Sequence, residues 1–162
     1  MTLEDHLARC ATALSDPAGP PTLYQAVQDS LGALLGHRLF TLLITTPDGT
    51  EVERIWTSDP EAYPLQGRKR MGPTPWGAHV LQGQRPWMCN DAEGIRWAFP
   101  DSALIESLGL GSCINIPVVA FGRTLGTLNI LDRPGAYPES GMETARLFGA
   151  LLVLPYAEAA RA

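Results

Sequence analysis

Three cysteines, Cys10, Cys89 and Cys113, are the residues of this chain best suited to covalent chemistry. A thiolate can attack a sulfoxide or a peroxide, and a second thiol can then resolve the sulfenic acid as a disulfide. The three lie in no Cys-x-x-Cys pair and at no metal-ligand spacing from a histidine, so the sequence indicates neither zinc nor a disulfide framework. We expect Cys89 and Cys113 to be buried structural thiols, and a new pairing between them is the alternative.

Histidines, carboxylates and glycines form no catalytic motif in this sequence. Of the three histidines, His79 is remote from the other two, and a lone histidine is more often a packing or surface residue than a ligand of haem or iron. A glycine-rich phosphate loop, a Gly-x-Ser-x-Gly elbow and paired catalytic carboxylates are all missing from the sequence. We therefore expect no catalytic residue, no metal and no cofactor.

Length and charge narrow the class of protein. The 162 residues suffice for one domain with its own core. A net charge of −5 does not suit a nucleic-acid-binding protein. No apolar run approaches the ~20 residues of a membrane span, and the first residues lack the basic-then-apolar order of a signal peptide. Together with unpaired cysteines, these features predict a cytoplasmic protein without a membrane partner.

Helices are predicted at both ends of the chain. Apolar residues recur at helical spacing over 3–14, and a proline-rich linker follows. Thr22 is a good N-cap for a second helix that ends near Gly36. A last helix is predicted over 138–161, where Pro155 should kink or end it because proline removes a hydrogen bond and clashes with the preceding turn.

The strands are predicted to form hairpins. Alternation with a period of two on both sides of a Phe-Gly-Arg-Thr connection predicts an antiparallel hairpin over 111–132, in the middle of the sheet. Pro117 cannot donate to a ladder, so its side of the strand should be unpaired, bulged or at an edge. A second hairpin joins 38–46 to 51–57 through a Pro-Asp-Gly turn.

The segment between the hairpins is predicted to be mostly irregular. In chain order we expect a polar excursion, a short helix, a short strand, a loop and a second short helix, at 58–72, 76–82, 85–89, 90–101 and 102–108. Thr74 should cap the first short helix, and Asp101 or Ser102 the second.

Two motifs within 111–132 are the most specific signal in the sequence. Residues 112–118 are Ser-Cys-Ile-Asn-Ile-Pro-Val, and residues 125–130 are Leu-Gly-Thr-Leu-Asn-Ile. They resemble the Ser-x-Leu-x-Val-Pro-Leu strand and the Leu-Gly-x-Leu-x-Leu partner of GAF domains, which are small-molecule-binding sensory modules. The resemblance covers 22–161.

The resemblance implies an α+β, profilin-like fold of three layers. A central antiparallel sheet of five to six strands would carry the terminal helices on one face. A roof of loops and short helices, 58–111, would cover a pocket on the other face. The whole chain, 1–162, is then one domain, with 1–21 as an N-terminal helix and linker.

A pocket under this roof would have aromatic walls and a few polar groups, as small-ligand sites do. Trp97 lies in the most irregular loop and is the first candidate for ligand contact. Asp101 is expected mainly as a helix cap. The predicted ligand-binding residues are Trp56, Trp76, Trp87, Asp91, Trp97, Phe99, Asp101, Cys113 and Asn115.

The predicted ligand is anionic or zwitterionic. Free backbone N–H groups at the starts of the two short helices would favour a carboxylate or phosphate. Carboxylates at Asp91 and Asp101 would repel an anion, whereas a zwitterion would use both signs of charge.

The resemblance implies a non-catalytic domain that binds its ligand without a covalent bond and signals through its terminal helices. A homodimer is the expected assembly, with a separate output protein as a further partner. The apolar stripe of Leu3, Leu7 and Leu14 suits dimer packing, or alternatively covers the protein's own sheet.

Two other functions stay open. Some stand-alone GAF proteins of similar length are free methionine sulfoxide reductases, which use thiols. Here Trp76 occupies one of their cysteine positions, a second falls near Gln66, and the loop before Ser112 contains no cysteine. The other alternative is a domain that only dimerises and has a collapsed pocket.

Overall fold

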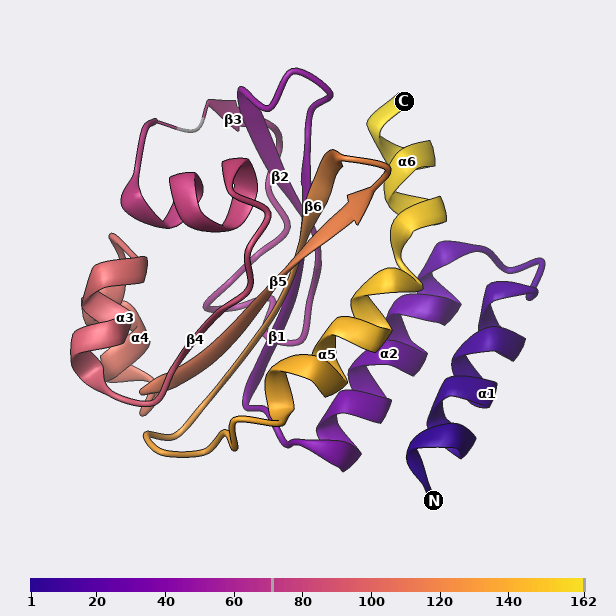
Figure 1. The fold of residues 1–162 in the computed structure, drawn as a ribbon, viewed down its shortest axis with the longest axis horizontal. Helices are drawn as coiled ribbons and strands as arrows, with labels where there is room; N and C mark the ends of the chain where they lie inside the picture. Colours follow the sequence, from indigo (N-terminus) through magenta and orange to yellow (C-terminus); the bar gives the residue numbers. More distant parts are fainter. Residues whose placement is uncertain (71, 162) are drawn as a thin grey trace.

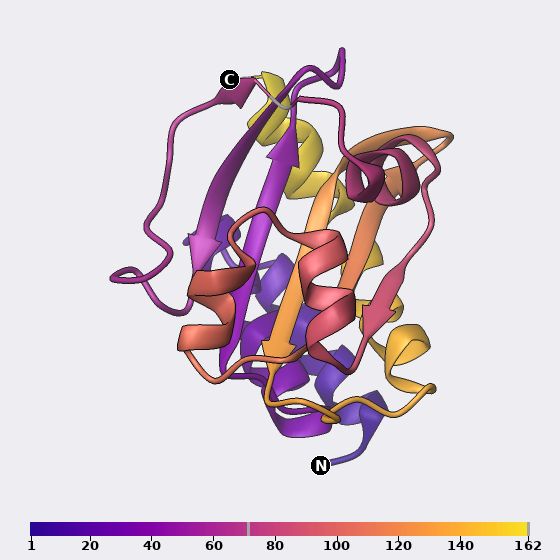
Figure 2. The same cartoon turned by 90° about the vertical axis from the view of Figure 1, so that its left-hand side faces the viewer.

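The computed structural model describes residues 1–70 and 72–161. These residues form three layers, with a six-stranded sheet between a layer of four longer helices and a layer of short helices and loops (Figure 1). Figure 2 shows the short elements lying across the sheet as a roof. The predicted α+β architecture is confirmed. Met71, within the predicted excursion 58–72, and Ala162, at the end of the predicted domain, lie outside the described residues.

The sheet has the strand order β3–β2–β1–β6–β5–β4, and each neighbouring pair is antiparallel. Among the described residues the strands are β1 (Leu39–Thr45), β2 (Glu51–Thr57), β3 (Lys69–Arg70), β4 (Trp87–Cys89), β5 (Ser112–Ala120) and β6 (Arg123–Asp132). Both predicted hairpins are confirmed, as β1–β2 and β5–β6. Because β5 and β6 each have a neighbour on both sides, their hairpin lies within the sheet.

Pro117 lies in β5 beyond the end of β4. The paired residues of these strands stop at Trp87 and Asn115, two residues before the proline. The missing N–H of Pro117 therefore breaks no hydrogen bond between β4 and β5. A register shift between β5 and β6 follows at Val118 and Val119. The predicted unpaired setting of the proline is confirmed.

The helical layer consists of α1 (Leu3–Leu14), α2 (Pro20–Leu34), α5 (Gly141–Ala150) and α6 (Val153–Arg161). The start of α2 corrects the predicted N-cap at Thr22. Gly19 is the N-cap, and two prolines fill the first turn, where the absent N–H is not needed. Each helix of the described residues is too short or too polar to cross a membrane.

The predicted C-terminal helix, 138–161, is divided between α5 and α6. The break falls at Leu151 and Leu152, whose backbone N–H groups bond carbonyls only three residues earlier. Pro155 is the third residue of α6 and lacks the N–H that would bond the carbonyl of Leu151. The proline therefore interrupts the helix one turn upstream of its own position.

The roof contains the segments η1 (Gly77–Gln82), α3 (Ala92–Ala98) and α4 (Ser102–Ser107), and the edge strand β4 lies between η1 and α3 in the chain. The hydroxyl of Thr74 accepts the N–H of Gly77 at 2.9 Å, as expected for a cap. The predicted loop over 90–101 is wrong, because α3 lies there. Asp91 caps α3 by accepting the N–H of Gly94 at 2.8 Å.

The main apolar core lies between the sheet and the four longer helices. Its largest fully buried side chains include Phe40, Leu42, Ile114, Phe148 and Tyr156. Because side chains alternate along a strand, the residues between these strand positions face the roof. That opposite face of the sheet carries a group of buried polar side chains.

Candidate functional site

Four polar side chains, Asn115, Asn129, Thr127 and Thr41, form a chain of contacts on the roof-facing side of the sheet, here called the amide ladder. Asn115 of β5 and Asn129 of β6 are direct cross-strand partners, and Nδ2 of Asn115 donates to Oδ1 of Asn129 at 2.9 Å. Nδ2 of Asn129 donates to the hydroxyl of Thr127 at 3.0 Å and lies 3.3 Å from that of Thr41. All four side chains are buried, so they satisfy one another away from water.

Trp76 joins the roof to the amide ladder. Its indole Nε1 donates to Oδ1 of Asn115 at 3.0 Å. Phe99 packs beside it, with ring centroids 6.3 Å apart, and the sulfur of Cys113 lies 3.7 Å from the same Oδ1. The structure thus brings together four predicted site residues, one pair from the roof and one pair from β5.

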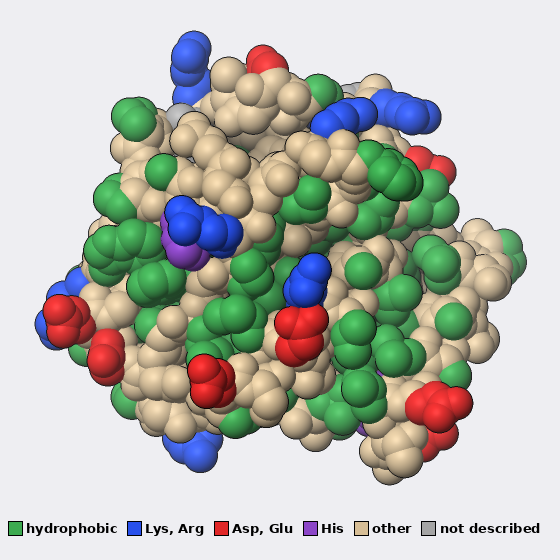
Figure 3. All heavy atoms as spheres, in the orientation of Figure 1, with side chains coloured by type: hydrophobic (Ala, Val, Ile, Leu, Met, Phe, Trp, Pro, Cys, Tyr) green, Lys and Arg blue, Asp and Glu red, His purple; other side chains and the backbone are tan. Residues whose placement is uncertain are grey.

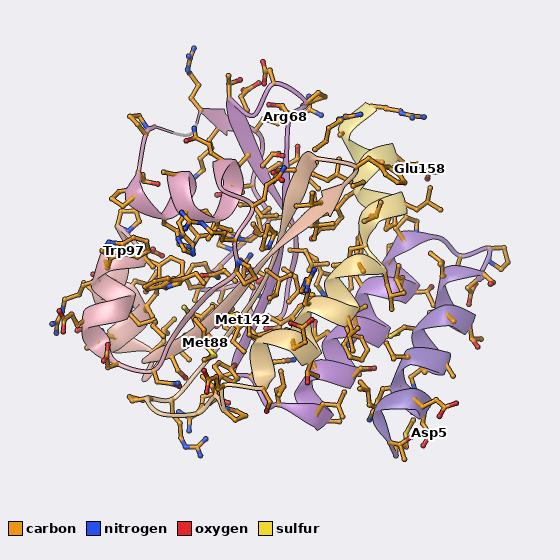
Figure 4. The ribbon with its side chains drawn as sticks, viewed as in Figure 1. Asp5, Arg68, Met88, Trp97, Met142 and Glu158 are labelled. Carbon is orange, nitrogen blue, oxygen red and sulfur yellow. The ribbon has the colours of Figure 1, made fainter. Side chains whose placement is uncertain are left out.

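A second aromatic group lies along the edge strand β4. Trp87 and Trp97 stack with ring centroids 4.3 Å apart, and His79 of η1 meets both rings edge-on. Figure 4 shows Trp97 on the outer side of α3, toward η1, and the residue is 42% exposed. Nε1 of Trp87 is buried and has no hydrogen-bond partner among the described residues. Trp97 therefore belongs to the outer surface of the roof.

Both predicted carboxylates have structural partners. Asp91 caps α3 through the N–H of Gly94. Asp101 stands before α4, yet its carboxylate accepts the hydroxyl of Tyr63 at 2.6 Å instead of an N–H of that helix. Burial and this neighbouring carboxylate raise the pKa of Tyr63 well above its usual value, so the hydroxyl keeps its proton and donates it. The predicted capping role of the Asp101 side chain is wrong.

Trp56 lies on the opposite face of the sheet from the amide ladder. Its Nε1 donates to Oε1 of Gln28 in α2 at 2.8 Å, and its ring packs against Tyr24. Its cross-strand partner is Leu42, which belongs to the core under the helices. The structure therefore separates Trp56 from the other predicted site residues and corrects its expected place under the roof.

A surface depression of about 580 Å³ opens beside β4 and α3. It is lined by residues 87–91 together with Glu93, Gly94 and Trp97. A second depression, of about 370 Å³, lies between η1 and the β1–β2 turn at Asp48. The first gives one thiol of the protein, Cys89, a route to solvent.

Cys89 and Cys113 are cross-strand partners on β4 and β5, and their sulfurs lie 3.4 Å apart. Both are free thiols. Cys113 is fully buried, whereas Cys89 is partly exposed. The expectation of two buried thiols is thus correct for Cys113 and wrong for Cys89, and the alternative of a pair has the geometry it needs.

A family model described as GAF domain matches residues 18–154. The chain belongs to the GAF domain family. The GAF domain of an Acinetobacter phosphoenolpyruvate-protein phosphotransferase is 14% identical with a TM-score of 0.75, over 98% of this chain and 96% of that one. The nlh2 GAF domain of A. aeolicus, in an inactive state, is 18% identical with a TM-score of 0.72, over 97% and 96%.

A third similar structure is the far-red absorbing dark state of a protein with bound biliverdin IXa. It is 14% identical with a TM-score of 0.65, over 99% of both chains. The search of curated proteins gave no match. These structural likenesses establish the fold of the GAF domain, and the family resemblance expected from the strand motifs is confirmed.

Several residues of the GAF domain's buried polar region were not predicted from the sequence, namely Asn129, Thr127, Thr41 and Tyr63. The sequence marks Asn129 only as an amide in an otherwise apolar strand, as Asn115 is in the partner strand. A register shift near Val118 sets the two amides opposite one another. No comparable local signal marks Tyr63, because it lies in the irregular excursion.

Proposed function

We propose that this GAF domain binds a small molecule between its sheet and its roof, without a covalent bond. Family membership supports a ligand in general, since GAF domains bind small ligands in sensory proteins. One similar structure holds biliverdin IXa. For this chain the proposal rests on the amide ladder, which Trp76 covers and to which it is hydrogen-bonded through Asn115.

The fold alone does not account for the amide ladder. Buried polar groups that bond only to each other add little net stability, and apolar groups of the same shape can replace such pairs at nearly no cost. Their value lies in specificity, because each amide and hydroxyl can exchange its present partner for a group of a ligand. A ligand that displaces the indole of Trp76 from Asn115 would meet a donor and acceptor array that is already ordered.

The chemistry of the ladder favours the class of ligand. The side chains of the amide ladder are amides and hydroxyls, and the indole of Trp76 lies over them. All of these groups are uncharged. Asp91 and Asp101, which made a zwitterion attractive, are engaged with Gly94 and Tyr63. We propose a ligand whose inner end is uncharged, with carbonyl and N–H groups for the ladder. Any anionic or zwitterionic group would lie at its outer end.

Strand β5 connects the proposed site to the helices. Asn115 faces the roof, whereas its neighbours Ile114 and Ile116 belong to the core under the helices. At Gly149 of α5 an added Cβ would lie only 3.0 Å from Cγ2 of Ile116, so this helix packs directly on the strand. A ligand that shifts Asn115 would therefore change how α5 packs on β5. The two states of the domain would then differ in this contact, as a signal requires.

Exposed leucines on the helical layer support signalling through a homodimer. Leu3, Leu14, Leu147 and Leu154 are between 37% and 57% exposed. Figure 3 shows hydrophobic side chains gathered over the region where Figure 1 places α1, α2 and α5. We propose that this layer packs against the same layer of a second copy of the protein, and that the dimer binds a separate output protein.

Native mass spectrometry of the purified protein tests the proposal. The expected spectrum contains a dimer that carries a small molecule, which denaturation releases unmodified. The variant Asn115→Leu should lose this molecule and stay folded. Gln84→Leu is the matched control, because its amide bonds the carbonyl of Gly122, away from the ladder.

Two results would count against this function. One is an empty wild-type protein whose melting temperature is unchanged by a panel of small heterocycles carrying carbonyl and N–H groups. The other is equal retention of a ligand by Asn115→Leu and wild type, which would place the ligand elsewhere. An empty dimer in the first case supports a domain that only dimerises.

A further inference from the structure

The paired thiols of Cys89 and Cys113 have the geometry of a closable disulfide. Their residues are direct cross-strand partners at the end of the β4–β5 ladder, and their sulfurs are 3.4 Å apart. A disulfide holds its sulfurs at about 2.05 Å, so the pair closes with a movement of little more than an ångström. The proposed ligand binding requires neither thiol, so the pair can be oxidised whether or not a ligand is bound.

The two thiols lie in different surroundings. Cys113 is fully buried, whereas Cys89 forms part of the wall of the 580 Å³ depression. A hydrogen bond from the Cys113 thiol lowers the pKa of Cys89, and that bond together with burial raises the pKa of Cys113. Cys89 is thus the accessible sulfur that ionises first, and Cys113 is the protonated sulfur behind it.

We propose that Cys89 and Cys113 are a redox-active dithiol, which a hydroperoxide entering the depression beside β4 oxidises to an intrachain disulfide. A hydroperoxide is the oxidant we assign because its reaction needs access to a sulfur and no further binding groups. Trp87, Asp91 and Trp97 line this opening together with Cys89.

The reaction proceeds in two balanced steps. The sulfur of Cys89 attacks the outer oxygen of the hydroperoxide, the O–O bond breaks, and the products are the Cys89 sulfenic acid and an alcohol, or water when the oxidant is hydrogen peroxide. The thiol of Cys113 then attacks the sulfenic sulfur, the S–O bond breaks, and water leaves with the proton of Cys113. Two thiols have lost two electrons in total, and the peroxide has gained them.

Oxidation would join the edge strand β4 covalently to β5. β4 is an edge strand that pairs with β5 through three residue pairs, and the disulfide would add a covalent link at the last of them. An added Cβ on Gly94 would lie 2.3 Å from Cβ of Cys89, so α3 rests directly on this residue. The link would therefore restrain both β4 and the first turn of α3.

Intact mass analysis of the reduced full-length protein after one equivalent of hydrogen peroxide tests the proposal. We expect the loss of two hydrogens per chain, reversal by dithiothreitol, and a non-reduced peptide map that joins Cys89 to Cys113. The proposal is overturned if both thiols survive, if Cys89 gains oxygen atoms while Cys113 stays reduced, or if the disulfide joins two chains.

Three matched cysteine variants assign the steps. Cys113→Ala should stop at a Cys89 sulfenic acid that dimedone traps, and Cys89→Ala should consume no peroxide. Cys10→Ala should behave as wild type, because Cys10 is buried in α1 and its nearest polar partner is Ser30. Circular dichroism shows whether each variant is folded. If a variant is unfolded, the result for the wild-type protein decides the proposal. Since Asn115→Leu retains both thiols, its disulfide formation should persist whether or not the ligand proposal holds.

Discussion

Replacing Asn115 with alanine should destabilise the GAF domain by about 3 kcal/mol, a large loss for a polar residue. The amide accepts from Trp76 at 3.0 Å and donates to Asn129 at 2.9 Å, and all three side chains are buried. Truncation leaves one donor and one acceptor without these partners, at about 1–3 kcal/mol each. We take a value in the lower half of the sum because a water molecule can enter the space left by the amide.

Urea unfolding followed by circular dichroism measures this loss. Trp76→Phe removes the donor from the same hydrogen bond, so the double variant with Asn115→Ala should be destabilised by less than the sum of the two single changes. The expected coupling is about 1–2 kcal/mol. Gln84→Ala, outside the ladder, should show no coupling with Trp76→Phe.

A loss below about 1 kcal/mol for Asn115→Ala, or strictly additive effects, would refute the reasoning. Either result would mean that solvent already reaches the indole and the amides. The roof would then not be closed over the ladder, and the site proposed for the ligand would lose its buried polar groups.

Three further predictions concern the sheet and its turns. Gly126→Ala should cost at least about 4 kcal/mol or prevent folding, because its Cβ would lie 2.0 Å from the carbonyl oxygen of Leu43; a near-normal melting temperature would contradict this. Tyr156→Phe should cost about 1–2 kcal/mol in urea unfolding, since the buried hydroxyl donates to the carbonyl of Thr127 at 2.8 Å. Hydrogen bonds from neighbouring threonines lower the pKa of Asp48 from 3.8 to about 2. Asp48→Ala should therefore be less stable than wild type above pH 3.8, and this difference should vanish as the pH falls through about 2. A pH-independent difference in thermal unfolding would contradict the prediction.

The strands were predictable because their signal is local. Alternating residues and a Pro-Asp-Gly turn specify a hairpin without knowledge of what covers it, and both hairpins are present. Even the setting of Pro117 followed from its missing N–H. The exact start of α2 was less accessible, because a glycine N-cap followed by prolines competes with Thr22, which has the better capping side chain.

The site was harder to predict because its contacts are long-range. Counting outward from the turn at Phe121 and Gly122 pairs Asn115 with Leu128, and only the register shift near Val118 brings Asn129 opposite to it. This bulge leaves little trace in the sequence. Trp56 shows the same limit, since an aromatic residue at the end of a strand suits either face of the sheet until its cross-strand partner is known.

A shared hydrogen atom links the amide ladder to the thiol pair. The single S–H of Cys113 has two acceptors, the sulfur of Cys89 at 3.4 Å and Oδ1 of Asn115 at 3.7 Å. It can serve one at a time, and when Cys89 is ionised the thiolate is the stronger acceptor. Disulfide formation removes this hydrogen, and Oδ1 of Asn115 then accepts the hydrogen bond from Trp76 without competition from Cys113.

The same competition acts in the opposite direction. A ligand that donates to Oδ1 of Asn115 would release the S–H of Cys113 toward Cys89, and this would favour the thiolate that reacts first. Because coupling between two sites is reciprocal, oxidation of the pair would in turn change the affinity of the ladder for such a ligand. The two proposed sites would therefore be coupled through one thiol and one amide, Cys113 and Asn115, which lie two residues apart on the same face of β5.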